Sequence, residues 1–416
     1  MPSAGCGCTV WGERLESAVA RVDPRPLEPG ERKESGMALA VPPGGTPPHT
    51  EYRPAAVQPS ATSPPRKRAA PPAAVVSVVI VNFCQWRNTA RLVGQLRHSI
   101  AVRTGAAEIV VVDNHSPFHP VVRKLEKTHG VTVRRFNRNL GFARGVNRGV
   151  NEGNNLEHPP RHKATSPQGP SDWVLLLNPD VTVEDDFLDE VIATIEKLTV
   201  SDAMAGVVGF RMRNRDGTAQ ASSGPFPTLL RTMAGLFLPR SRRKCTHRPE
   251  EARQPVDWVT GGCLLVRRDC FSQLGGLDES FFLYYEDVDF CRRAVEAGWG
   301  VWFDPSLEVT HHWPLHARRV PAPLRLMTRH ALLNYAKKHW SWWRARTMSA
   351  VVWGEAVFRQ AWAALRGDWD ASRCYGQLRR LVGDVAAGRD KEARRRIRYA
   401  AAFLDPIAAE QDGRTA

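Results

Sequence analysis

The chain has 416 residues, of which 42% are hydrophobic, and its formal net charge is +15. Its length allows two or three domains, but no uncharged apolar run approaches the ~18 residues of a transmembrane helix, and no secretory signal opens the chain. Because the eight cysteines are scattered without the spacing of zinc ligands, the composition predicts a reduced, cytoplasmic protein.

Residues 1–72 form a proline-rich segment. They hold 14 of the 31 prolines, together with many Gly, Ser and Ala, and show no apolar periodicity. Such a composition buries too little surface to offset the entropy lost on ordering, so we expect a disordered tail. Met37 within this segment is an alternative to Met1 as the start of the protein.

An alternating β-α pattern follows the tail. Strands are predicted over Val75–Val81, Glu108–Val112 and Val131–Val133, with helices over Thr89–Ile100 and about 118–128. The first strand is continuously apolar, as expected when both faces of a parallel sheet are buried. This order predicts an α/β fold with a doubly wound sheet, in which ligands bind beyond the carboxyl ends of the strands.

Polar residues follow the predicted strands at this edge. Asn82 ends the first strand, and Asp113 and Asn114 end the second. The segment 137–149 then spaces its glycines every four residues as it enters a helix. These glycines either let the backbone approach a ligand at the helix start or serve tight helix packing. The segment is not a P-loop, because Gly-Lys-Ser/Thr is missing.

A candidate cation ligand follows the next strand. After a polar, proline-rich insertion at 153–170, the strand Asp172–Leu177 ends in Asn178-Pro179-Asp180. A carboxylate at this place suits a hard cation such as Mg²⁺ or Mn²⁺. Turn chemistry favours the same three residues, so both interpretations stay open.

Further along, we predict a helix over 185–198, a strand over Ala205–Phe210, a loop-rich basic stretch over 211–255 and a strand over Val256–Val266. A last short strand, at about 300–310, ends in His311 and His312. A single histidine is usually structural, but two at a strand end are candidate metal ligands.

Three acids open a helical pattern after an aromatic run. In the segment 275–290, Phe-Phe-Leu-Tyr-Tyr leads into Glu286, Asp287 and Asp289, and the apolar residues that follow recur at spacings of three and four. Carboxylates in the first turn of a helix are held ionised by its N–H groups and dipole. They serve as a base, as cation ligands or simply as helix caps.

The chain beyond Pro321 is predicted to be helical and is rich in Trp and Arg. Residues 310–416 hold 20 Lys and Arg against 9 Asp and Glu. Aromatic residues beside cations suit a membrane interface or another anionic partner. The alternative is a helical subdomain packed on the sheet, with a solvated basic surface. No base-reading motif points to nucleic acid.

The ordered motifs between Val75 and Arg318 resemble those of family 2 glycosyltransferases, particularly their bacterial rhamnosyltransferase-like branch. Five blocks carry the resemblance: Val-Ile-Val-Asn-Phe, Val-Val-Asp-Asn-His-Ser, Asn-Leu-Gly-Phe-Ala-Arg-Gly-Val-Asn-Arg-Gly, Leu-Leu-Leu-Asn-Pro-Asp, and Gly-Gly-Leu-Asp-Glu-Ser-Phe-Phe-Leu-Tyr-Tyr-Glu-Asp-Val-Asp-Phe-Cys-Arg-Arg. The resemblance implies a GT-A fold, a Rossmann-like, doubly wound mixed sheet, over residues 73–320. A disordered tail (1–72) would precede it and a basic, Trp-rich helical region (321–416) would follow.

The resemblance also implies a donor site. Asp113 would accept a hydrogen bond from the pyrimidine of a nucleotide sugar, and Asn82 and Phe83 would line the same base pocket. The ribose and diphosphate would be bordered by the residues Asn139, Gly141 and Phe142.

The resemblance further implies the metal ligands and the catalytic base. Asp180 corresponds to the last acid of the family's Asp-x-Asp metal motif, and His311 to its metal-binding histidine, with His312 as the alternative register. Asp287 corresponds to the catalytic base, while Glu286 and Asp289 would orient the helix start or contact the acceptor. After the histidines, Trp313–Arg318 replaces the small Gly/Ser-rich turn usual in the family.

The implied function is an inverting glycosyl transfer that depends on Mn²⁺ or Mg²⁺. The donor would be a dTDP- or UDP-sugar, with dTDP-rhamnose first, and the acceptor a glycan or lipid-linked sugar of the cell envelope. The protein would be peripheral at the inner face of the plasma membrane, with no nucleic acid partner. UDP-galactofuranose or UDP-hexosamine donors, or a catalytically silent nucleotide-sugar-binding protein, are the alternatives.

Overall fold

The computed structural model describes residues 76–151, 172–237, 252–313, 320 and 322–402. The predicted tail (1–72), the predicted insertion (153–170), most of the Trp313–Arg318 segment and the most basic part of the loop-rich stretch (240–244) lie outside the described residues.

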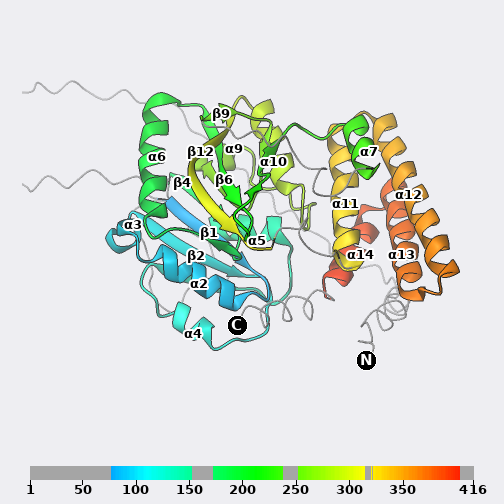
Figure 1. The fold of residues 1–416 in the computed structure, drawn as a ribbon, viewed down its shortest axis with the longest axis horizontal. Coiled ribbons are helices and arrows are strands. Elements are labelled where there is room, and N and C mark those ends of the chain that lie inside the picture. The colour runs from blue at the N-terminus through cyan, green and yellow to red at the C-terminus, as the bar shows by residue number, and fades with distance from the viewer. Residues whose placement is uncertain (1–75, 152–171, 238–251, 314–319, 321, 403–416) are drawn as a thin grey trace, which may run out of the picture.

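A ten-stranded mixed sheet forms the centre of the molecule (Figure 1). Its main path runs β3-β2-β1-β4-β11-β6-β12-β5, with β7 beside β6 and β9 beside β12. The first four strands on this path are parallel, whereas β11 is antiparallel to both β4 and β6. The main strands are β1 (Val76–Asn82), β2 (Ala107–Asp113), β3 (Val131–Arg135), β4 (Trp173–Leu177), β6 (Ala205–Arg213), β11 (Cys263–Arg267) and β12 (Gly300–His311). The short strands are β5 (Val181–Thr182), β7 (Ala219–Gln220), β9 (Gln254–Pro255) and a separate pair, β8 (Ser223–Gly224) with β10 (Trp258–Val259).

Helices cover both faces of the sheet, which explains the continuous apolar runs of its central strands. One buried cluster joins the sheet to α2 (Trp86–Leu96), α3 (Ile100–Thr104), α4 (Val121–Leu125) and α6 (Phe187–Ser201). A second cluster on the other face includes α5 (Phe142–Asn151), α9 (Arg268–Gln273) and α10 (Glu286–Glu296). The segment α7 (Leu229–Phe237) packs toward the C-terminal helices.

Four C-terminal helices form a bundle with a core of its own. They are α11 (Ala322–His339), α12 (Trp342–Leu365), α13 (Trp369–Ala386) and α14 (Asp390–Ala401). Figure 1 shows α11 between the sheet and α12. Ala331 and Tyr335 of α11 belong to the sheet's second core cluster, so this helix joins the bundle to the sheet. No helix in the described part of the chain is long and apolar enough to span a bilayer.

The predicted α/β mixed sheet and the helical C-terminal region are both confirmed, but several predicted elements differ. The predicted strand Val256–Val266 is two strands, β10 and β11, interrupted at Gly261 and Gly262. The predicted helix Thr89–Ile100 is two helices, since α2 begins earlier and ends at Leu96 before α3. The loop-rich stretch 211–255 contains a helix, α7, that its weak periodicity did not indicate.

Candidate functional site

Parallel pairing of β1 and β2 places Asn82 beside Asp113 at the carboxyl edge of the sheet. Asn82 Nδ2 donates to Asp113 Oδ1 at 3.0 Å, and both side chains are fully buried. The other Asp113 oxygen accepts from Arg135 Nε at 3.0 Å. Donors of the protein itself therefore satisfy both oxygens of this buried carboxylate.

Asn82, Asp113 and Arg135 form a cluster at the strand ends, and Arg135 is its partly exposed member. Its side chain is 34% exposed, and its guanidinium carbon lies 5.9 Å from the ring centres of both Trp86 and Phe118. Sequence reasoning missed Arg135, although it ends β3 just as Asp113 ends β2. The same strand-end rule applied to the third strand points to this edge, but the predicted strand ended at Val133, two residues before Arg135.

Phe83, predicted beside the nucleotide base, is half-buried and packs against the core of the C-terminal bundle. It therefore joins the carboxyl edge of β1 to the helical region. The structure brings Asn82 and Asp113 into contact, while the contacts of Phe83 lie on the bundle side.

The turn before α5 is held by hydrogen bonds from side chains. Asn114 accepts from Leu140 N at 2.8 Å and donates to Gly141 O at 3.1 Å, and Asn139 Oδ1 accepts from Gly141 N at 2.9 Å. Gly141 has φ +89°, and a Cβ there would lie 2.6 Å from Phe282 O. Phe142 N donates to the same carbonyl at 2.7 Å. This glycine thus allows close contact between the turn and the aromatic run before α10.

The other glycines of the 137–149 segment also serve packing. A Cβ on Gly145 would lie 3.0 Å from a Val81 methyl group, and one on Gly149 would lie 2.6 Å from a Val79 methyl group. The tight-packing alternative therefore accounts for the four-residue spacing. The predicted ligand role remains with Asn139, Gly141 and Phe142, at the start of the helix.

Pairing of β5 with β12 brings Asp180 to His311. His311 Nε2 lies 3.3 Å from Asp180 Oδ2, and the two side chains are only 11% and 8% exposed. The neighbouring His312 is directed elsewhere: its Nε2 lies 2.5 Å from Thr182 Oγ1, while its backbone N–H donates to Asp180 O. Of the two histidines, His311 is the one whose ring faces the carboxylate.

The Asp180–His311 pair fits a divalent cation. Two ligands held about 2.1 Å from one ion at right angles are roughly 3 Å apart, close to the observed separation. Among residues that the structure describes, no group of three or more His, Cys, Asp or Glu gathers around a possible ion. Mg²⁺ is typically held by one or two carboxylates together with substrate phosphate oxygens, and Asp180 supplies one such carboxylate.

Gln220 of β7 supports this interpretation. His311 Nδ1 lies 3.0 Å from Gln220 Nε2, while the buried Gln220 Oε1 has no hydrogen-bond partner among the residues that the structure describes. The nitrogen and oxygen of a side-chain amide occupy equivalent positions, and which is which is decided by their hydrogen bonds. With the amide turned over, Oε1 accepts from His311 Nδ1–H, which leaves the Nε2 lone pair for a metal.

Two arginines that sequence reasoning missed lie near this pair. Burial lowers the pKa of Arg91 on α2, while the charge of Asp180 acts in the opposite direction. Burial also lowers the pKa of His312, and the charges of Arg91 and Arg215 add to this effect. Both arginines therefore contribute positive charge at this pair, as an anionic ligand would require.

Asp287 lies at the start of α10, just after two residues in strained backbone. Tyr284 and Tyr285 have φ of 73° and 66°, a left-handed conformation that costs a non-glycine residue about 1–3 kcal/mol and occurs often at functional sites. Asp287 Oδ2 accepts from Gly261 N at 2.9 Å, and Oδ1 accepts from Val288 N at 2.9 Å. Its side chain is half-exposed, whereas Glu286 is 5% exposed. Asp287 is thus the acid of this turn that reaches solvent.

The interruption between β10 and β11 links the two acidic positions. Gly261 N donates to Asp287, and Gly262 O accepts from Asn178 N at 3.1 Å. The predicted continuous strand is broken because these two residues bind α10 on one side and the turn before Asp180 on the other. The break therefore fixes Asp287, the candidate base, relative to Asp180, the candidate metal ligand.

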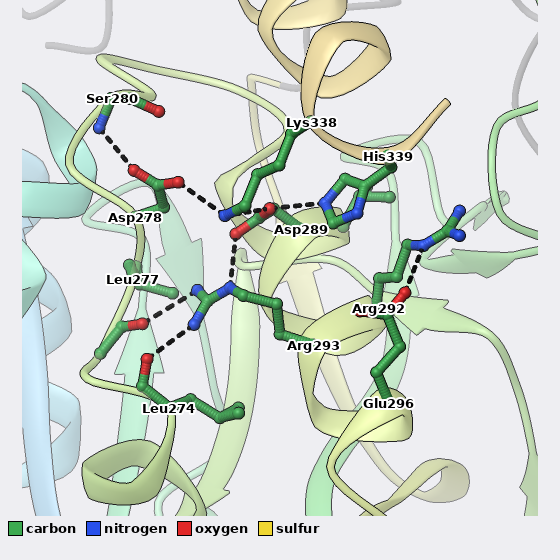
Figure 2. Close-up of polar contacts among 12 residues, drawn as sticks. Leu274, Leu277, Asp278, Ser280, Asp289, Arg292, Arg293, Glu296, Lys338 and His339 are labelled. Carbon is green, nitrogen blue, oxygen red and sulfur yellow. Dashed lines mark hydrogen bonds and ion pairs between the residues drawn. The ribbon is translucent and has the colours of Figure 1, made fainter. Parts of the chain in front are cut away.

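Asp289 is enclosed rather than directed to a ligand (Figure 2). It is 0% exposed and accepts from Arg293 Nε at 2.8 Å, His339 Nε2 at 2.7 Å and Lys338 Nζ at 2.8 Å. Burial raises the pKa of Asp289, but the His339 hydrogen bond and the charges of Arg293 and Lys338 outweigh it, leaving the pKa below its usual value. Of the two roles considered for Asp289, its contacts support orienting the helix.

Comparisons with known proteins show the family of the chain. The family model "Glycosyltransferase like family 2" matches residues 71–332. The chain is 31% identical over 279 residues to the N-acetylglucosaminyl-diphospho-decaprenol L-rhamnosyltransferase of Mycobacterium tuberculosis, an alignment covering 65% of this chain and 87% of the relative. It is 27% identical over 245 residues to the low-salt glycan biosynthesis hexosyltransferase Agl10 of Haloferax volcanii, covering 59% and 69%. The mannosyltransferase PcManGT of Pyrobaculum calidifontis, solved with GDP-Man and Mn²⁺, aligns at 15% identity and a TM-score of 0.41, covering 82% and 90%. The chain is therefore a glycosyltransferase of family 2, with the GT-A fold and rhamnosyltransferase relatives.

Proposed function

We propose that this glycosyltransferase moves L-rhamnose from dTDP-rhamnose to a lipid-linked acceptor with inversion at the anomeric carbon, at the inner face of the plasma membrane. The observation that carries the proposal is the backbone link through Gly261 and Gly262, which holds Asp287 in a fixed relation to the turn before Asp180. The choice of sugar and acceptor rests on the relative whose name specifies L-rhamnose and a decaprenyl diphosphate sugar.

Asp180 and His311 are the proposed holders of Mg²⁺ or Mn²⁺. When bound, the ion offsets the charge that develops on the nucleotide diphosphate leaving group. Gln220 fixes the His311 ring, so that Nε2 rather than Nδ1 is presented. Arg91 and Arg215 add positive charge on the same side, which favours a diphosphate.

Asp287 is the proposed general base. It takes the proton of the acceptor hydroxyl as that oxygen forms a bond to the anomeric carbon, while the bond from this carbon to the diphosphate oxygen breaks. The N–H groups of Gly261 and Val288 hold the carboxylate in a fixed orientation before proton transfer. Because the attack comes from the face opposite the leaving group, one displacement inverts the configuration.

The donor's nucleoside is assigned to the strand-end cluster. Asn82, Phe83 and Asp113 form or support the base pocket, and Arg135 is the group whose side chain reaches solvent there. Asn139, Gly141 and Phe142 would border the ribose and diphosphate. Glu286 is proposed to support the acceptor side of the site from its buried position.

A thermal-shift screen tests the donor assignment, because a ligand that binds only the native state raises the melting temperature. We expect dTDP-rhamnose with Mn²⁺ to raise it more than UDP-galactofuranose, UDP-hexosamines or GDP-mannose. A larger rise in melting temperature with one of the UDP-sugars would make that sugar the donor in place of dTDP-rhamnose. Donor binding without release of nucleotide diphosphate in the presence of acceptor would instead indicate a silent binding protein.

A further inference from the structure

The side of α12 turned away from the bundle core carries an unusual set of exposed apolar side chains, which we term the outer face of α12. Their exposed fractions range from 46% to 84% in a structure where most large apolar residues are buried. Phe358, Trp362 and Leu365 are spaced four and three apart and share one stripe. The outer face consists of Trp343, Phe358, Trp362 and Leu365, with Trp342 and Trp353 on its flank.

The opposite side of the helix already has its packing partners. Met348, Val352 and Ala356 are fully buried in the core of the bundle. The outer face is thus not required to hold α12 in place. Trp369, 62% exposed at the start of α13, and Leu230, 80% exposed on α7, are further exposed apolar side chains on two helices that contact α12.

Arginines accompany the exposed tryptophans. The guanidinium carbons of Arg344 and Arg366 lie 5.1 Å and 4.6 Å from the rings of Trp343 and Trp362. Neither arginine forms an ion pair within the described part of the chain. Residues 342–401 hold 13 Lys and Arg against 6 Asp and Glu, so the surface is apolar and cationic together.

These properties favour one partner. Tryptophan is enriched where a protein meets the headgroup region of a bilayer, because its ring is apolar and its N–H is polar. A helix with aromatic residues and arginines on its exposed side lies in that interface and is attracted to anionic lipids. A second copy of the chain would bring like charges together, which disfavours self-association through this face.

We infer that the outer face of α12 docks this protein on an anionic phospholipid bilayer. The inference deepens the proposed function and rests on it in one respect: a lipid-linked acceptor must be reached at the membrane surface. Docking would be interfacial, since no described helix is able to span the membrane. It would hold the bundle, and through α11 the sheet, beside the acceptor's headgroup.

Co-sedimentation of the full chain with vesicles tests the inference without any substrate. We expect binding to phosphatidylglycerol-containing vesicles, weaker binding to pure phosphatidylcholine, and a decrease with added salt. The triple variant Trp342→Ser, Phe358→Ser, Leu365→Ser should bind at least about tenfold more weakly, since three apolar side chains no longer leave water. Arg344→Glu with Arg366→Glu should selectively weaken binding to the anionic vesicles.

The matched control removes equally exposed apolar side chains from the sheet region. Ile100→Ser with Val200→Ser, at positions 58% and 92% exposed, should leave vesicle binding unchanged. Absence of vesicle binding by the unaltered chain, or equal binding by the triple variant, would overturn the inference. So would sedimentation showing a dimer that the triple variant dissociates.

Transfer to a soluble, short-chain acceptor separates this inference from the proposed function. The triple variant should retain transfer to such an acceptor while losing transfer to a vesicle-embedded one. If neither the unaltered protein nor the triple variant transfers sugar, the proposed function fails while the vesicle result still stands. Equal loss of both transfers in the triple variant would contradict the docking role.

Discussion

The carboxylate of Asp289 lies 2.7 Å from His339 Nε2, at the last residue of α11. Lys338, one residue earlier, bridges Asp289 and Asp278. The helix that carries the base candidate is therefore tied to the C-terminal bundle by a buried, charged cluster (Figure 2). It follows that the bundle helps to fix the geometry of the candidate site.

Asp289→Asn is expected to destabilise the protein by about 3–5 kcal/mol, because it leaves Arg293 and Lys338 without their shared carboxylate in a buried place. Denaturant unfolding measures the effect. The control is Asp390→Asn, which removes the exposed pair with Lys337 and should cost at most about 1 kcal/mol. If Asp289→Asn lowers the free energy of unfolding by as little as Asp390→Asn does, the structural role of Asp289 is contradicted.

The same carboxylate predicts a pH dependence. The folded-state pKa of Asp289 is lowered, so the stability that its ionised carboxylate contributes is fully present above the unfolded pKa of about 3.9. This stability is lost as pH falls through the folded-state pKa. Thermal melts of the unaltered protein and Asp289→Asn should therefore differ most above about pH 5 and converge in stronger acid. A constant difference down to pH 2 would argue against an ionised Asp289.

Buried His330 on α11 predicts a second, separate pH effect. Burial lowers its pKa to about 4, so between that value and the unfolded pKa of about 6.5 the unfolded chain binds the extra proton. Stability should therefore fall as pH drops through this window, by roughly 3 kcal/mol from this residue. His330→Met should flatten the melting-temperature profile there, and an unchanged profile would contradict the assignment.

Metal binding is the next test. Asp180→Ala and His311→Ala should each lower Mn²⁺ affinity, measured by calorimetry with nucleotide diphosphate present, by at least about 100-fold, and Gln220→Ala by about 10–100-fold through the ring orientation. The control is His312→Ala, since that ring contacts Thr182 rather than Asp180. A larger loss for His312→Ala than for His311→Ala would reverse the choice of ligand.

Gly141→Ala tests the contact between the turn before α5 and Phe282. We expect a loss of at least about 1–3 kcal/mol of stability, since φ is +89° and the new methyl group meets a backbone carbonyl. Gly383→Ala is the matched control, because nothing lies within 4 Å of its Cβ position on α13. That substitution should stabilise the helix by about 0.5–1 kcal/mol.

Much of the sheet was predictable from sequence because parallel strands end at one edge. This rule identified Asn82, Asp113 and Asp180 as strand-end residues. It did not reveal that β5 pairs with β12, the long-range contact that brings Asp180 to His311. Local periodicity carries no information about such pairings.

Two other features lay beyond the sequence patterns. The run Val256–Val266 is apolar enough for one strand, but hydrogen bonds at Gly261 and Gly262 from distant segments break it. Asp289 and His339 are 50 residues apart, so the enclosure of this acid depends on how α11 docks. Only tertiary structure separates the enclosed Asp289 from the half-exposed Asp287.

The central claim is that Asp287 removes the acceptor's proton, and Asp287→Asn tests it most directly. With saturating dTDP-rhamnose, Mn²⁺ and acceptor, we measure release of dTDP and, separately, donor affinity. Loss of the base should lower kcat by about 10²–10⁴, while the Kd for the donor stays nearly unchanged because the amide has the same shape and keeps one of the two backbone hydrogen bonds. An Asp287→Asn variant that turns over at the unaltered rate would contradict the account.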